Sequence, residues 1–143
     1  MKKHRGQPGF ETRIAGTVLD SLWSLVTMPF RKKGPTIDRA RVQDAWQDVE
    51  HLADGSNQEV KLAVVKADSV FDGILKRKVS GETMGERLKN AKSKFSGQTY
   101  NNLWEAHKLR NSIAHEAHFE PDLQELRIAV ARFRRALQEI GIL

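Results

Sequence analysis

Apolar residues recur every three or four positions along most of the chain after residue 36, and this spacing gathers them on one side of a helix. No stretch shows the alternation of apolar and polar residues that a half-buried strand would need. Two capping boxes, Ser56 with Glu59 and Thr83 with Glu86, mark helix starts. The sequence therefore predicts an all-α protein, an up-and-down bundle of four to five helices with an extra amphipathic helix N-terminal to it.

Apart from a short helix after Thr83, the expected helices of the bundle are long, at about residues 37–53, 59–79, 99–115 and from Pro121 onward. We expect Thr36 to cap the first of them, and Pro121 to lie in the first turn of the last. Residues 96–98 are expected to form a loop. The apolar stripe is clearest in the last helix, at Leu126, Val130, Phe133, Leu137 and Ile140.

Charge divides the chain into two parts. The net charge of +6 comes mostly from residues 1–35, which hold seven basic and two acidic side chains, whereas residues 36–143 hold 17 and 16. We therefore predict a basic arm over residues 1–35 and a helical domain over residues 36–143. Because the domain is nearly neutral, sequence-independent binding to a nucleic-acid backbone is not indicated for it.

Cysteine is absent, which excludes disulfide bonds and thiolate metal sites and fits a reducing compartment such as the cytoplasm. The basic residues near the N-terminus are not followed by a clean apolar run with a small-residue cleavage site. We therefore expect no secretory signal.

Residues 14–33 form an amphipathic segment in which apolar residues recur at helical spacing. Asp20 and several hydroxyl side chains make it too polar for a confident membrane span. Trp23 and the flanking basic residues, Arg13 on one side and Arg31–Lys33 on the other, are typical of a helix lying in the interface of an acidic membrane. The same pattern also fits a helix that packs on the domain, and both readings stay open. In the first case the protein would lie at the inner face of the membrane.

The best candidate for chemistry is the run from Arg110 and Asn111 to His115, near the end of an expected helix. Arginine is always charged and forks onto phosphate oxygens, and histidine can take and give a proton near neutral pH. This combination indicates a phosphate-handling site once a second element or subunit closes a cleft over it. In the structural alternative Arg110 pairs with Glu105 or Glu116, while Asn111 and His115 satisfy backbone groups at the helix end.

Metal chemistry is weakly supported. His115 and Glu116 begin like a zinc-protease motif, but Phe119 occupies the position of its second histidine. His107, Asn111 and His115 stand four residues apart on one helix face, yet asparagine is a poor metal ligand. No glycine-rich phosphate loop is present. We therefore expect neither a metal nor a cofactor.

The Arg–His run resembles the signature of the HEPN superfamily, in which an arginine, usually followed by a polar residue, precedes a histidine by four to six intervening positions. Here these residues are Arg110, Asn111 and His115. A closer resemblance, to small bacterial HEPN-like proteins, covers about residues 40–143. In such proteins a hydrophobic N-terminal helix often precedes the module. The phrases that carry this likeness are residues 61–68, 81–88 and 103–111.

The resemblance implies a helical module that forms a homodimer and brings two Arg–His motifs into one cleft. Active members are metal-independent endoribonucleases, so His115 would act as general acid or base on the 2′-hydroxyl or the leaving oxygen of RNA. Arg110 would stabilise the charge on the phosphorane, and Asn111 would orient the pair. Many members are non-catalytic. The alternative is therefore a protein- or nucleotide-binding or dimerisation module, or a peripheral membrane adaptor that works through residues 14–33.

Overall fold

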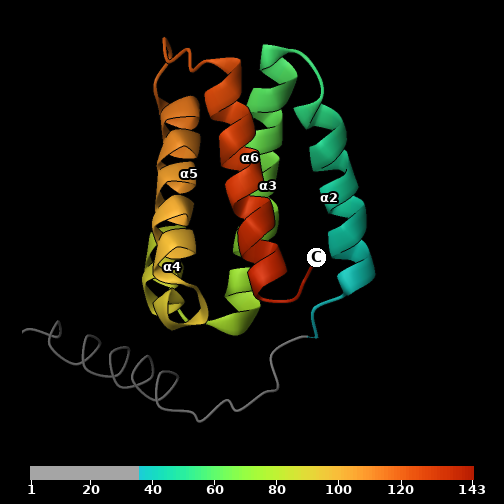
Figure 1. Ribbon diagram of the computed structural model, residues 1–143. Helices are drawn as coiled ribbons and strands as arrows, with labels where there is room; N and C mark the ends of the chain where they lie inside the picture. The colour runs from blue at the N-terminus through green and yellow to red at the C-terminus, as the bar shows by residue number, and fades with distance from the viewer. Residues whose placement is uncertain (1–35) are drawn as a thin grey trace, which may run out of the picture. The chain divides into compact units, whose positions relative to one another are not determined.

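A computed structural model describes residues 36–143, and all regular structure in that part of the chain is helical (Figure 1). The predicted all-α bundle is confirmed. The predictions for residues 1–35, including the extra amphipathic helix and its membrane contact, lie outside the described residues. The elements are α2 (Arg39–Ala53), α3 (Asn57–Lys78), α4 (Met84–Asn90), the 3-10 helix η1 (Lys92–Lys94), α5 (Gly97–His115) and α6 (Leu123–Glu139).

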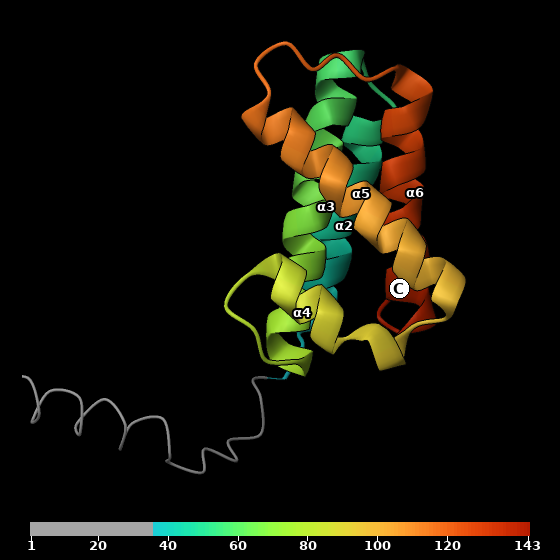
Figure 2. The ribbon, with the colours of Figure 1, turned by 90° about the vertical axis from the view of Figure 1, so that its left-hand side faces the viewer.

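The four long helices run alternately up and down, and α4 and η1 lie in the connection from α3 to α5 (Figure 1). Helix α3 is central, because it packs against α2, α5 and α6, while α5 also packs along α6. Figure 2 shows that α5 crosses α3 and α6 obliquely, so that its C-terminal end lies beside α3 and away from α6. This crossing leaves the end of α5 with fewer neighbours than its middle.

Helix starts are fixed by side-chain caps. Both predicted capping boxes form: the Glu59 carboxylate accepts from the Ser56 backbone N–H at 2.7 Å, and Thr83 Oγ1 accepts from the Glu86 N–H at 3.1 Å. Each box satisfies backbone donors that the first helical turn leaves without an intrahelical partner.

The predicted starts of the four long helices are each wrong by two residues, and α3 begins at Asn57 instead of about residue 59. Helix α2 is capped by Asp38 and not by Thr36, because a carboxylate two positions later accepts from the Arg41 N–H at 3.3 Å. Helix α5 starts at Gly97, because the Ser96 hydroxyl caps it. Pro121 lies before the cap of α6, which is Asp122. For α2, α5 and α6, a residue near the predicted boundary has a side-chain oxygen that is better placed to cap the helix.

The core forms where α3, α5 and α6 meet. Phe71 of α3 lies at its centre, with ring centroids 6.0 Å from Phe95 and 5.7 Å from Phe133. The predicted stripe of α6 is buried except for Ile140, which is partly buried. The fully buried side chains of largest volume include Phe71, Leu75, Leu88, Leu103, Leu126, Phe133 and Leu137.

An ion pair between Asp72 and Arg87 fixes α4 against α3. Arg87 Nε lies 2.7 Å from Asp72 Oδ1, and Arg87 also donates to the Gly81 carbonyl at 2.7 Å. Gly81 has a φ of +142°, and a Cβ there would lie 2.9 Å from the Arg87 backbone nitrogen, so only glycine fits. Lys76 Nζ lies 3.1 Å from the other Asp72 oxygen.

The first testable prediction concerns this ion pair. Burial raises the pKa of Asp72, but hydrogen bonds from Arg87 and Lys76 outweigh it and hold the pKa below its ordinary value of 3.8. The carboxylate therefore stabilises the fold above that value, and this contribution is lost as the pH falls through the lower, folded-state pKa. We expect Asp72→Asn to flatten the loss of stability below about pH 4 in urea titrations at a series of pH values. An unchanged acid slope would contradict this account.

Candidate functional site

The predicted site residues lie close to the C-terminal end of α5. His115 is the last residue of the helix. Helical geometry places Arg110 and His115 about 140° apart around the axis, with Asn111 and Ala114 between them. Arg110 and Asn111 are partly buried, while Ala114 and His115 are exposed.

The residue that organises this region is Asp68 of α3, which the sequence analysis did not single out as a site residue. Its side chain is 7 % exposed. One carboxylate oxygen lies 2.8 Å from His107 Nδ1, and the other lies 3.4 Å from Arg110 Nε. The buried Arg110 Nε makes no hydrogen bond, so its contact with Asp68 is an ion pair only. Asp68 therefore ties two successive turns of α5 to α3.

Asn111 extends these contacts. Its Nδ2 lies 3.3 Å from His107 Nε2, and its Oδ1 accepts from an Arg110 terminal nitrogen at 3.3 Å. The directions of these hydrogen bonds are consistent if His107 carries its hydrogen on Nδ1, donates it to Asp68 and accepts from Asn111 at Nε2. We call Asp68, His107, Arg110 and Asn111 the α3–α5 polar network. Within it, each of the four side chains helps to orient another.

The structure corrects the structural alternative for Arg110 and Asn111. Arg110 pairs with Asp68, and Glu105 pairs instead with Lys108 at 3.1 Å. Asn111 bonds two side chains rather than the backbone groups of the helix end. The reason is tertiary: a buried carboxylate on α3 attracts the guanidinium more strongly than an exposed acid of its own helix.

His115 lies outside the polar network, on a groove of about 560 Å³ between the first half of α3 and the end of α5. We call this the α3–α5 groove. Leu62 lines this groove and is 54 % exposed, and Lys61 Nζ lies 2.6 Å from Glu120 Oε2. Among residues 36–143, no hydrogen bond or ion pair joins Arg110 to His115. The groove is lined by Gln58, Lys61, Leu62, Val65, Ile113, Ala114, His115, Glu116, Ala117, Phe119 and Glu120.

The bundle end that carries His115 is acidic. Residues 50–61 and 115–127 hold seven acidic and two basic side chains, and we call these two segments the acidic end. An exposed histidine there can exchange protons with solvent or a ligand. The surrounding carboxylates favour a cationic ligand or partner over a free anion.

Residues 36–143 contain no group of three or more His, Cys, Asp or Glu side chains placed to hold a metal ion. In that same part, no helix is both long enough and apolar enough to cross a membrane. The chain matches no model of a known family, no curated protein and no solved structure.

One sequence signal does point to Asp68. It lies four residues after Val64 and three before Phe71, both of which are buried, so it occupies an apolar face of α3. A charged residue at such a position needs a partner. That partner could not be named from the sequence, since it depends on how α5 crosses α3.

Proposed function

We propose that this chain is a HEPN-like module that pairs with a second copy of itself, and that the pair cleaves RNA without a metal ion. One feature of α5 carries the proposal. Arg110 is held by Asp68 and Asn111 while 30 % of its side chain stays exposed, and exposed His115 follows five residues later, at the end of the same helix. Together they provide a pre-oriented cation and an accessible acid–base group.

The proposal includes a second copy because Arg110 and His115 make no contact within one chain. The α3–α5 groove has features of a surface that meets its own copy. Leu62 offers exposed apolar area, and the rim carries both signs of charge in Lys61, Glu116 and Glu120. A two-fold interface places each patch against itself, so a rim of mixed charge can be self-complementary.

The proposed reaction is cleavage by the neighbouring 2′-hydroxyl. His115 takes the proton of that hydroxyl, or gives one to the leaving 5′-oxygen. The 2′-oxygen bonds to phosphorus and the bond to the 5′-oxygen breaks, which yields a 2′,3′-cyclic phosphate and a 5′-hydroxyl. Arg110 stabilises the negative charge that builds up on the phosphorane, and Asn111 orients the Arg110 guanidinium.

A non-catalytic binding module is the second candidate, and the charge distribution favours it. Asp68 already faces Arg110, and most of the charged side chains at the acidic end are carboxylates. RNA would approach such an end against electrostatic repulsion. In this alternative the α3–α5 polar network fixes α5 against α3, and the groove between them holds a segment of a partner protein.

The second testable prediction concerns self-association. Leu62→Glu is expected to weaken the dimer at least about 10-fold, because it places a charge in the centre of the apolar contact. Ile128→Glu is the matched control. Leu62 and Ile128 are the two large exposed apolar residues of the described part, and Ile128, at 42 % exposed, lies on α6 outside the groove. Sedimentation equilibrium of the two variants measures the difference.

The wild type is expected to be a dimer at high micromolar concentration. A wild-type monomer there would remove the shared cleft and with it the proposed mechanism. Equal weakening by Leu62→Glu and Ile128→Glu would place the interface elsewhere.

A further inference from the structure

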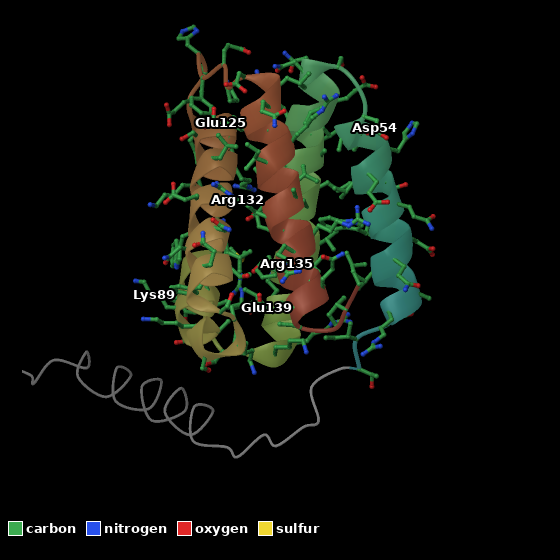
Figure 3. The ribbon with its side chains drawn as sticks, in the orientation of Figure 1. Asp54, Lys89, Glu125, Arg132, Arg135 and Glu139 are labelled. Carbon is green, nitrogen blue, oxygen red and sulfur yellow. The ribbon has the colours of Figure 1, made fainter. Side chains whose placement is uncertain are left out.

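The end of the bundle opposite His115 carries the opposite charge. Residues 36–41 and 76–94, where α2 starts and α3, α4 and η1 meet, hold nine basic and three acidic side chains. We call these two segments the basic end. Figure 3 shows Lys89 at this end, and Asp54 and Glu125 at the acidic end. The near-neutral domain is therefore strongly polarised along its long axis.

Most of this positive charge is available to a partner. Arg87 is buried against Asp72 and contributes little to the surface. Glu86 is engaged in the cap of α4, where it accepts from the Glu82 N–H at 2.7 Å. Two cations of this end are paired, Arg41 with Asp38 at 3.2 Å and Lys76 with Asp72 at 3.1 Å, and the others, except Arg87, face no acidic partner among the described residues. The exposed basic side chains of 76–94 are Lys76, Arg77, Lys89, Lys92 and Lys94.

The chain also enters the domain at this end. Arg77 donates to the carbonyl of Thr36 at 3.3 Å, which places the first described residue beside the end of α3. Just before it in the sequence come the basic Arg31–Lys33 and the amphipathic segment of residues 14–33 with Trp23. Two cationic features thus follow each other directly along the chain.

We propose that the basic end of the bundle binds an acidic phospholipid surface. A single shallow amphipathic segment holds a protein to a membrane reversibly, and a second, electrostatic contact makes the attachment stable. Lysines near an anionic leaflet each add to that attraction. The basic end supplies such an electrostatic contact, because Lys89, Lys92 and Lys94 lie on the short α4–η1 stretch at this end (Figure 1).

Lipid fits these observations better than RNA. Four of the seven exposed cations of the basic end are lysines, which attract anionic headgroups as point charges, whereas RNA recognition draws on arginine and aromatic stacking. The amphipathic sequence pattern and Trp23 of residues 14–33 also suit a membrane interface. Because α5 runs from the basic end to the acidic end, membrane binding would direct the α3–α5 groove away from the lipid.

The test uses the full-length chain and phosphatidylcholine vesicles with or without about 30 % phosphatidylserine, in about 0.1 M salt. The variant is Lys89→Gln/Lys92→Gln/Lys94→Gln. The matched control, Lys66→Gln/Lys108→Gln/Arg127→Gln, removes the same charge outside the basic end. Co-sedimentation with vesicles is measured after thermal melting has shown that all three proteins are folded, and binding to a polyuridine RNA is measured alongside.

We expect the wild type to bind the acidic vesicles only, the basic-end variant to bind about 10-fold more weakly, and the control to stay within about twofold. Wild-type affinity in the basic-end variant would overturn the proposal, as would equal weakening by the control variant. Loss of RNA binding with vesicle binding unchanged would assign this end to RNA instead. Since no readout depends on RNA cleavage, the result is independent of the proposed nuclease activity.

Discussion

Replacing His115 with alanine is expected to lower the rate of metal-free RNA cleavage at least about 100-fold, the range typical of losing a general acid or base. The fold should be unaffected, because His115 is exposed at the last position of α5 and no side-chain hydrogen bond to its ring is present among residues 36–143. A surface substitution of this kind changes stability by less than about 0.5 kcal/mol. Cleavage rates and urea denaturation measured on the same samples separate the two effects.

His118→Ala is the matched control, since His118 is also exposed and lies in the connection from α5 to α6. It should cleave RNA like the wild type. Arg110→Lys keeps the charge that faces Asp68 but loses the guanidinium fork, so it should also cleave slowly while staying folded. Full activity in His115→Ala, or an equal loss in His118→Ala, would show that His115 is not the acid–base group.

Replacing Asp68 with alanine is expected to lower the free energy of unfolding by about 3 kcal/mol. The change leaves a half-buried guanidinium and a buried imidazole nitrogen without their partner, and breaking a buried ion pair costs about 3–5 kcal/mol. We take the lower end of that range because Arg110 is 30 % exposed, so water can solvate part of its charge. Urea denaturation measures the loss.

Asp44→Ala is the control for Asp68→Ala. Asp44 is an exposed carboxylate on α2, and its removal should cost less than about 0.5 kcal/mol. The loss in the free energy of unfolding for Asp68→Asn should lie between the losses for Asp68→Ala and Asp44→Ala, because the amide oxygen can still accept from His107 although the charge is gone. A loss of under about 1 kcal/mol in Asp68→Ala would mean that the polar network does not tie α5 to α3.

The helices could be predicted because their determinants are local. Apolar spacing identified α3 and α6, and the capping boxes identified Ser56 and Thr83 as the N-caps of α3 and α4. The errors came where two capping residues compete within a few positions, as with Thr36 and Asp38. That competition is decided by small differences in hydrogen-bond geometry, which the sequence does not express.

The candidate site could be predicted only in part, because its contacts are long-range. The run of Arg110, Asn111 and His115 was identified, but its organising partner Asp68 lies on another helix. Because α5 crosses α3 obliquely (Figure 2), the sequence does not show that Asp68 meets Arg110, nor that His115, about 140° further around the axis of α5, lies outside this contact. Likewise, the near-zero net charge of the domain did not indicate its acidic and basic ends, because a net charge does not show where the charged residues lie in the fold.

The most direct test of the proposed function is incubation of the wild-type protein with a mixed set of RNAs in excess EDTA, at a concentration where it is dimeric. The proposal predicts cleavage products that end in a 2′,3′-cyclic phosphate and a 5′-hydroxyl, and no product with His115→Ala. Intact RNA across the whole set, from a folded and dimeric wild type, would contradict the nuclease and leave the non-catalytic module as the function of this fold.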